Sequence, residues 1–332
     1  MVRQRSIRLT LATVIVVAMA ACSSGDDGGG EPATETGGET TAPAAGPTGD
    51  PSTDKLAQIL ARGTLVGYFE PEFPPQSFAV QGATRPADTK CAEDQLTAAE
   101  VDGYDIRTTV LVAEALGVEA CFITPTWTEV TAGNWGDRFD IVYGSGSINS
   151  DRMQRLWMTQ PYYAVPVSYF VREDSPYQSP SDLDGLKIGT CASCSQELYL
   201  RGELEIPGVD IQPSVQDPEI VTFQIETPGL RALADGKVDA FLAADQVGQG
   251  QIDEGLPLRK LDPPAFTYYP SGFVDKSSGL SVAAFVEQVN EIIRQAEADG
   301  TLQELSEEWF GTDYVSGAAT FDLEAIGQGE VQ

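Results

Sequence analysis

Residues 136–144 read GDRFDIVYG, and residues 235–243 read DGKVDAFLA. In each segment, glycine and charged residues are followed by an aspartate and then by apolar residues, which indicates a turn that leads into a strand. Each segment also comes after a stretch with helical apolar spacing, which itself comes after another expected strand. A repeated order of strand, helix and strand is typical of parallel sheets covered by helices. We therefore expect an α/β protein with two similar lobes rather than one long sheet.

The segments around the two repeats carry further signals of the same kind. Strands are expected at 64–69, 118–124 and 183–190. Asp105 is expected to cap the helix that follows it. Near the end of the chain, Thr301–Glu304 read TLQE, which matches a capping box at the start of a last helix.

The first residues are typical of an export signal. A basic stretch, RQRSIR at 3–8, precedes the apolar segment Leu9–Met19, which is too short to span a bilayer comfortably. Small residues then lead to a cysteine in MAAC at 19–22, and this arrangement resembles a bacterial lipobox. We therefore expect a lipoprotein signal peptide at 1–21 and lipidation of Cys22, which would anchor the protein to the cell membrane. A plain secretory cleavage would instead leave Cys22 as a stray thiol.

Composition separates the N-terminal region from the rest of the chain. Residues 22–54 are mostly Gly, Thr, Pro, Ala, Asp and Glu, so this stretch is expected to be a disordered acidic tether. The whole chain has 20 basic and 50 acidic residues, which gives a net charge of −30. This balance argues against nucleic acid as a partner, because phosphate binding needs clustered Lys and Arg. We interpret the acidity mainly as a source of solubility.

Four cysteines remain when Cys22 is set aside. An even number in an exported protein indicates two disulfides, for which the sequence allows three pairings. We favour Cys91–Cys121, which would join the insertion after the first strand to the second strand, and Cys191–Cys194 within the stretch CASC. The same stretch admits a reduced redox pair, although redox motifs of this spacing occur in a different βαβ context.

The chain contains no histidine. Its absence excludes Ser-His-Asp and Cys-His nucleophilic catalysis, and it excludes every zinc site that uses histidine. A zinc site of four cysteines would need two close pairs, and the separation of Cys91 from Cys121 argues against it. We therefore expect neither a metal nor a cofactor.

Four segments together resemble one known family. They are GTLVGYFEPEFPPQSF (63–78), GYDIRTTVLVAEALGVEACFITPTW (103–127), FDIVYGSGSINSDRMQRLWMTQPYY (139–163) and LSVAAFVEQVNEIIRQAEADGTLQELSEEWFGTDY (280–314). In their order and spacing they are similar to the bacterial extracellular solute-binding proteins of family 3, which deliver amino acids to ABC importers. The resemblance runs from Leu56 to Val315, nearly the whole expected folded body.

The resemblance implies a type II periplasmic-binding-protein fold. In this fold two α/β lobes are joined by two crossing segments, and the ligand lies in the cleft between the lobes. The crossings are expected near Tyr163–Pro166 and Pro263–Tyr268, and such lobes close on a ligand by hinge motion. The expected division of the chain is lobe 1 at 55–163 and 267–315, lobe 2 at 164–266, and a C-terminal tail at 316–332.

The resemblance also implies a binding site, residue by residue. Arg152 matches the arginine that grips the ligand carboxylate, and its planar fork suits bidentate binding. Cys194 and Ser195 match a loop whose backbone N–H groups meet the same carboxylate. The other matches are Gly144, Ser145 and Ser147, which offer backbone and hydroxyl groups, and Phe73 and Trp127, which stack on the ligand side chain. The alternatives are a surface arginine for Arg152 and simple loop packing for Phe73.

One position departs from the family pattern. The family places an aspartate that binds the ligand ammonium five residues after Asp239, where this chain has Ala244 and then Asp245. A shift of one residue along a strand turns a side chain to the other face of the sheet. Asp245 reaches the ligand if the strand has ended or bulges; otherwise Glu70 supplies the charge, or the ligand has no α-ammonium.

The resulting hypothesis is a lipid-anchored, monomeric receptor outside the cytoplasm. It would capture a small carboxylate-bearing solute, an amino acid above all, and pass it to an ABC permease. The alternatives are an enzyme of the same fold that catalyses dehydration, a redox protein, and a sensor that signals to a partner. An enzyme needs an acid or base with a shifted pKa beside the ligand. The sequence offers only Glu70 for that role, so we expect no enzymatic activity.

Overall fold

The computed structural model describes residues 49–319 and 321–331. The expected signal peptide, the lipidation site Cys22 and most of the expected tether lie outside these residues. Within the described part of the chain, none of the helices has the length and apolar character needed to cross a membrane.

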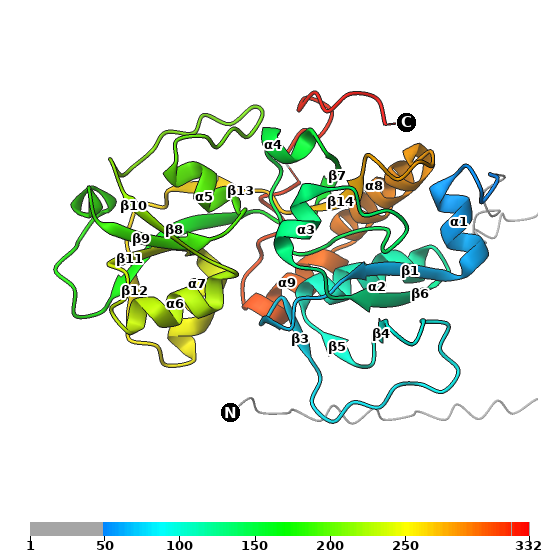
Figure 1. The fold of residues 1–332 in the computed structure, drawn as a ribbon, viewed down its shortest axis with the longest axis horizontal. Coiled ribbons are helices and arrows are strands. Elements are labelled where there is room, and N and C mark those ends of the chain that lie inside the picture. The colour runs from blue at the N-terminus through cyan, green and yellow to red at the C-terminus, as the bar shows by residue number, and fades with distance from the viewer. Residues whose placement is uncertain (1–48, 320, 332) are drawn as a thin grey trace, which may run out of the picture. The chain divides into compact units, whose positions relative to one another are not determined.

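The first lobe combines the N-terminal half of the described chain with a C-terminal segment that returns to it (Figure 1). Strand β1 pairs in parallel with β6, while β4 lies antiparallel on the other edge of β6. Strands β7 and β14 form an antiparallel pair, and β2, β3 and β5 form a small third sheet. The elements are α1 (Lys55–Arg62), β1 (Thr64–Tyr68), β2 (Glu72–Phe73), β3 (Ser77–Ala79), β4 (Leu96–Thr97), β5 (Val101–Asp102), α2 (Tyr104–Ala115), β6 (Glu119–Ile123), α3 (Trp127–Ala132), α4 (Ser150–Met153), β7 (Leu156–Pro161), β14 (Ser271–Asp275), α8 (Ala283–Ala298) and α9 (Thr301–Phe310).

The second lobe has a single sheet with the strand order β10-β9-β11-β8-β12, and β13 also pairs with β8. Figure 1 shows α5 on one face of this sheet and α6 and α7 on the other. The elements are β8 (Val165–Arg172), the short 3-10 helix η1 (Pro180–Leu183), β9 (Lys187–Cys191), α5 (Ser195–Leu200), β10 (Glu219–Phe223), α6 (Glu226–Ala234), β11 (Ala240–Ala244), α7 (Asp245–Asp253), β12 (Leu258–Lys260) and β13 (Phe266–Tyr268).

The sheet of the second lobe is only partly parallel. Strands β10, β9 and β11 run in parallel, as the repeated pattern predicts. Strand β8 is antiparallel to β11, β12 and β13. Through β8 the chain enters this lobe, and through β13 it leaves, so the two crossings lie side by side. The ladder between them continues to the pair Tyr268–Val165, two residues beyond the expected boundary at 266.

The repeated aspartates perform the same task in both lobes. The N–H of Asp140 donates to the carbonyl of Val66 at 2.8 Å, and its Oδ2 accepts the N–H of Val66 at 2.9 Å. The N–H of Asp239 donates to the carbonyl of Lys187 at 2.8 Å, and its Oδ2 accepts the N–H of Lys187 at 3.0 Å. Each aspartate therefore fixes the segment that follows it against the neighbouring strand of its lobe.

The first repeat departs from the expected strand after its aspartate. Residues 141–144 form no ladder; Val142 makes only an isolated bridge to Phe273, whereas the second repeat forms the full strand β11. Glycines at 144 and 146 lie where the first repeat departs from the second. A Cβ on Gly144 would lie 2.8 Å from the ring of Tyr68, and one on Gly146 would lie 2.4 Å from Phe273. At these two positions aromatic rings pack directly against the backbone.

Two expected helix caps are wrong. Helix α2 begins at Tyr104 after Gly103, so Asp105 lies inside the first turn. Its buried carboxylate accepts hydrogen bonds from the side chains of Tyr162 at 2.5 Å and Ser145 at 2.7 Å. Helix α9 follows Gly300 without a side-chain cap, because the hydroxyl of Thr301 donates backwards to Asp299 at 2.6 Å. In both cases a nearby polar partner outcompetes the helix terminus for the side chain.

The structure contains the two disulfides that the sequence favours. Cys91–Cys121 joins the insertion between β3 and β4 to β6, and Cys191–Cys194 closes a short loop between β9 and α5. The segment after 315, expected as a tail, packs on the first lobe. The amide of Gln328 bonds both the N–H and the carbonyl of Met158, at 2.9 and 3.0 Å.

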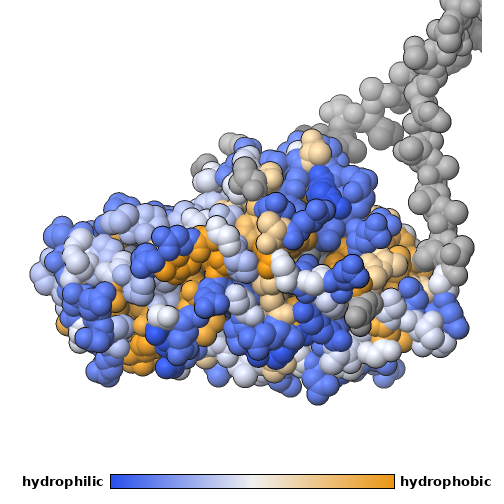
Figure 2. Space-filling model, turned by 90° about the horizontal axis from the view of Figure 1, so that it is seen from above, coloured by the Kyte–Doolittle hydropathy of each residue, from blue (hydrophilic) through white to orange (hydrophobic). Residues whose placement is uncertain are grey.

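The surface is largely hydrophilic. Figure 2 shows one face on which hydrophilic residues predominate, with smaller apolar areas between them. In the described part of the chain, Val80 is the only large apolar residue that is exposed. This surface is consistent with the excess of acidic residues and offers no broad apolar patch.

The environment of Asp140 generates a stability prediction. Its carboxylate pairs with Lys55, which is 2% exposed, at 2.7 Å, and with Arg62. Asp140→Asn removes the buried carboxylate next to the ammonium of Lys55 and leaves it only Gln58 at 3.1 Å and the exposed Asp137 at 3.9 Å, so the free energy of unfolding should fall by about 3–5 kcal/mol. The matched control is Asp239→Asn, because Asp239 accepts the equivalent backbone N–H without any ion pair in the described chain. Urea denaturation measures both, and equal losses would contradict the assigned role of the ion pair.

Candidate functional site

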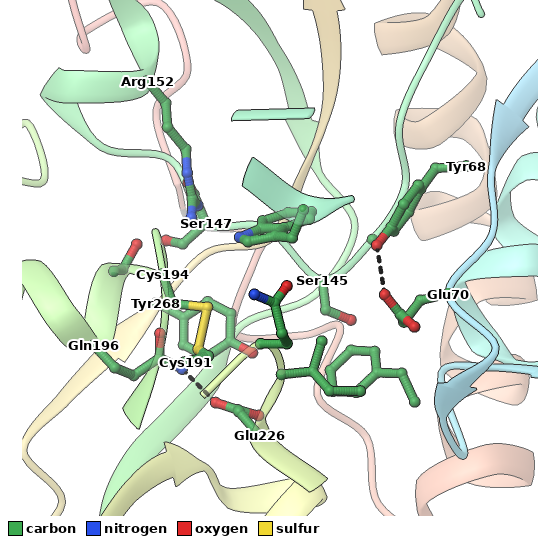
Figure 3. A pocket seen from close by; sticks show the side chains of 16 residues that line it. Tyr68, Glu70, Ser145, Ser147, Arg152, Cys191, Cys194, Gln196, Glu226 and Tyr268 are labelled. Atoms are coloured by element: carbon green, nitrogen blue, oxygen red, sulfur yellow. Dashed lines mark hydrogen bonds between the residues drawn. A yellow bond between two sulfur atoms is a disulfide. The ribbon is translucent and has the colours of Figure 1, made fainter. Parts of the chain in front are cut away.

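One pocket collects residues from both lobes (Figure 3). Nine of the ten residues expected in the ligand site line it, and only Asp245 does not. The lining from the first lobe is Tyr68, Glu70, Phe73, Trp127, Gly144, Ser145, Ser147 and Arg152. The lining from the second lobe and the returning crossing is Cys191, Cys194, Ser195, Gln196, Gln224, Ile225, Glu226 and Tyr268.

Asp245 has a different task. Strand β11 ends at Ala244, and Asp245 opens helix α7, where its Oδ2 pairs with Nζ of Lys260 at 2.7 Å. The shift of one residue has therefore turned the carboxylate away from the pocket and given it a cation within its own lobe. The expectation that Asp245 lies in the ligand site is not met.

Arg152 presents a buried positive charge to the pocket. It lies in α4, whose first turn is capped by the side chain of Asn149, and it is 3% exposed. Nη1 donates to the carbonyl of Ser147 at 2.7 Å, and Nη2 donates to the carbonyl of Ser193 in the second lobe at 2.9 Å. Burial lowers the pKa of Arg152 to about 10, so the guanidinium stays charged at neutral pH.

The surroundings of Arg152 stabilise its charge without neutralising it. Its guanidinium carbon lies 5.2 Å from the ring centre of Trp127 and 5.5 Å from that of Phe273, within the range of cation–π attraction. Among residues 49–319 and 321–331, no carboxylate forms an ion pair with it. A buried charge without a counter-ion is costly, so the site is suited to a ligand anion.

Glu226 is a charged residue of the pocket lining that the sequence did not reveal. It is the first residue of α6, it is 4% exposed, and its Oε1 accepts hydrogen bonds from Gln196 at 2.6 Å and from the N–H of Ala244 at 3.2 Å. No group of the described chain bonds its Oε2. Burial raises the pKa of Glu226 to about 8. Figure 3 shows its carboxylate and the guanidinium of Arg152 entering the pocket from different sides.

A second carboxylate lies in another part of the pocket. Glu70 accepts a hydrogen bond from the hydroxyl of Tyr68 at 3.0 Å, and Figure 3 shows the two side chains together. Burial raises the pKa of Glu70 above its ordinary value. The pKa of Tyr68 is also raised, first by burial and then by the negative charge of Glu70. The rings of Phe73 and Trp127 add apolar surface to the lining.

The serine segment of the site is held from behind. Ser145 adopts a left-handed backbone with φ 55, and its N–H donates to the hydroxyl of Tyr162 at 3.0 Å. The hydroxyl of Ser145 donates to Asp105, whose pKa burial raises to about 7. The hydroxyl of Ser147 accepts the N–H of Tyr269 at 3.1 Å. These contacts fix the segment before any ligand arrives.

The segment around α4 touches the second lobe at three points. Besides the bond from Arg152 to Ser193, Nδ2 of Asn149 donates to the hydroxyl of Ser195 at 3.0 Å. The N–H of Ser150 donates to the carbonyl of Glu205 at 2.9 Å. The two lobes are therefore in direct contact beside the pocket, as in a closed arrangement.

Comparisons with known proteins identify the family of this chain. The family model for bacterial extracellular solute-binding proteins, family 3, matches residues 77–312. The L-cystine-binding protein TcyJ of Escherichia coli (strain K12) is 27% identical over 260 residues, which cover 78% of this chain and 86% of the relative. Cyclohexadienyl dehydratase of Pseudomonas aeruginosa is 24% identical over 216 residues, which cover 62% of this chain and 74% of the relative.

Solved structures show the same fold. Tv2483 bound to L-arginine matches with a TM-score of 0.63 at 19% identity, over 80% of this chain and 96% of the other. Its likeness supports the type II periplasmic-binding-protein fold. Since the family model covers more than half of the chain, this protein belongs to the bacterial extracellular solute-binding proteins, family 3.

Proposed function

We propose that this protein binds an amino acid in the pocket between its lobes and delivers it to an ABC permease. The observation that carries the proposal is the buried guanidinium of Arg152, which lines the pocket and lacks a carboxylate partner in the described chain. A ligand carboxylate would supply the missing negative charge. Two similar proteins are the L-cystine-binding protein TcyJ and Tv2483, whose structure is that of the complex with L-arginine.

Glu226 is the proposed partner of the ligand ammonium. In the family an aspartate at the position of Ala244 binds the ammonium, and here Glu226 would bind it instead. The two positions are adjacent, because the N–H of Ala244 donates to the carboxylate of Glu226. Oε2 of Glu226 has no bonding partner in the described chain and is therefore free for the ligand. A cation next to this carboxylate would favour its ionised form and lower its pKa.

The remaining charge of the pocket favours a cationic side chain on the ligand. Arg152 is the only Lys or Arg among the lining residues of the described chain, whereas Glu70 and Glu226 are two carboxylates. When both carboxylates are ionised, the lining carries one net negative charge. An amino acid with a positive side chain has one net positive charge and would balance the lining. Cystine has two carboxylates, and the second would need another cation in the pocket.

The wider setting follows from the family and the N-terminal sequence. We propose a monomer tethered by a lipid on Cys22 outside the cytoplasm, with lobe 1 at 55–163 and 267–315 and lobe 2 at 164–266. The lobes would move about the adjacent strands β8 and β13, which carry both crossings. A receptor that signals instead of transporting would use the same pocket and a different membrane partner.

One observation favours an enzyme as the second candidate. A buried carboxyl with a pKa of about 8 is protonated at neutral pH and can act as a general acid. Glu226 meets this condition, and one relative is a dehydratase. Incubation of the protein with a cyclohexadienyl substrate and detection of an aromatic product would favour the enzyme over the receptor.

A ligand panel tests the proposed function. Ligand at 100 times its dissociation constant adds about 2.7 kcal/mol of stability to a protein that binds it only when folded. We expect thermal shifts from amino acids with cationic side chains, smaller shifts from neutral ones, and no consumption of the ligand. The absence of a shift with every amino acid tested would contradict the proposal.

Replacement of Arg152 tests the carboxylate subsite. Arg152→Ala removes the only positive charge of the pocket lining in the described chain, so ligand binding should weaken by about 2–5 kcal/mol. The matched control is Arg155→Ala, because Arg155 lies on the surface nearby and pairs with Asp151 at 2.5 Å. Isothermal calorimetry measures both affinities, and circular dichroism checks the fold. Unchanged affinity in the Arg152 variant would refute its role.

The pH dependence of binding tests Glu226. In the free protein its pKa is about 8, and a bound ammonium lowers it, so binding at pH 7 releases a proton. Affinity should therefore be constant above pH 8 and fall by up to about tenfold for each pH unit below it. Glu226→Gln should remove this dependence and the proton release, which calorimetry detects in buffers of different ionisation enthalpy. A flat profile in the wild type would argue against the assignment.

A further inference from the structure

The loop CASC at 191–194 lies in the pocket wall, yet the recognition of an amino acid does not in itself require a disulfide. Cys191 is the last residue of β9, and Cys194 directly precedes α5. The Cys191–Cys194 bond therefore joins the end of a central strand to the start of a helix. Two residues, Ala192 and Ser193, are enclosed in the ring that it closes.

Ser193 connects this ring to the other lobe. Its carbonyl accepts the hydrogen bond from Nη2 of Arg152 at 2.9 Å, and its N–H donates to Oε2 of Glu197 at 2.8 Å. Its backbone is left-handed, with φ 60. A residue with a Cβ adopts this conformation only at a cost, so the surrounding structure must hold it there.

The carbonyl of Ser193 is the only group of the second lobe that bonds the guanidinium of Arg152 within the described chain. The other contacts of the same segment lie beside it, from Asn149 to Ser195 and from Ser150 to Glu205. If the loop relaxed, the buried cation would lose one of its two carbonyl acceptors, and the segment around α4 would lose one of its hydrogen bonds to the second lobe.

We propose that the Cys191–Cys194 disulfide positions the carbonyl of Ser193 against Arg152, and that reduction of this disulfide opens the contact between the lobes and weakens ligand capture. In the reduction, a dithiol reductant supplies two electrons and two protons. The Sγ–Sγ bond breaks to give two thiols, and the reductant closes to its own disulfide. Only the effect on ligand capture rests on the proposed function; the effect on the lobes does not.

Amide hydrogen exchange of the ligand-free, full-length protein tests the proposal. Ser150 is the first residue of α4, and its N–H donates to the carbonyl of Glu205 in the second lobe. Exchange of this N–H therefore reports the contact between the lobes. In Cys191→Ala/Cys194→Ala, exchange in the peptides that contain Ser150 and Ser193 should be about tenfold faster than in the wild type, as expected for the loss of one hydrogen bond to a charged group. Alanine is used because serine would cap α5 and preserve the loop.

Controls separate this effect from a general loss of structure. Exchange in β1 and β11 should be unchanged in the variant, and dithiothreitol should accelerate Ser150 in the wild type but not further in the variant, which keeps Cys91–Cys121. If the variant is unfolded, the reduced wild type decides the matter on the same peptides. Equal exchange at Ser150 and Ser193 in the oxidised and reduced wild type would overturn the proposal.

The effect of the disulfide on ligand affinity is measured separately. The probe is L-arginine, which does not react with dithiothreitol. Calorimetry should give a dissociation constant about tenfold larger for Cys191→Ala/Cys194→Ala than for the wild type. Equal constants would overturn the claim about capture. If the wild type does not bind L-arginine at all, the ligand class proposed above is wrong, while the exchange experiment still decides the role of the disulfide.

Discussion

The guanidinium of Arg152 is the constraint on which the site depends. It is buried, it stays charged at neutral pH, and no carboxylate of the described chain neutralises it. Carbonyl groups from both lobes, at Ser147 and Ser193, and two aromatic rings stabilise the charge instead. One of these contacts, the bond to Ser193, also joins the two lobes, and the guanidinium lines the pocket. In the proposed function the same charge receives the ligand carboxylate, so one buried group takes part both in the contact between the lobes and in ligand binding.

The scaffold that presents this charge uses one local device twice. Asp140 and Asp239 each exchange two hydrogen bonds with a residue of the neighbouring strand, Val66 in the first lobe and Lys187 in the second. After this shared start the two lobes diverge. The second repeat continues as a buried strand, while the first leaves the sheet at its glycines and becomes the serine segment of the pocket. One repeat supports the fold alone, and the other supports both the fold and the site.

The sequence predicted most of this organisation because local pattern and family spacing carry it. The order of strands and helices follows from local patterns, the pairing Cys191–Cys194 from two cysteines close together in the chain, and the placement of Arg152 from the resemblance to the family. Glu226 could not be found in this way, because one acidic residue among 50 has no local mark that it faces a pocket. The prediction for Asp245 was wrong for a related reason, because its ion pair with Lys260 forms only once the chain has folded. In both cases, partners distant in the sequence determine whether the side chain faces the pocket.

The two ends of the proposed ligand meet different chemistry in the free protein. Arg152 has a pKa of about 10, so it remains protonated at neutral pH, and backbone carbonyl groups stabilise its charge. Glu226 has a pKa of about 8 and can remain neutral until a cation arrives. The anion subsite is therefore charged and preformed, whereas the cation subsite becomes charged only when it is used. This asymmetry spares the protein a second unpaired buried charge, and it makes the proposed ammonium subsite respond to pH while the carboxylate subsite does not.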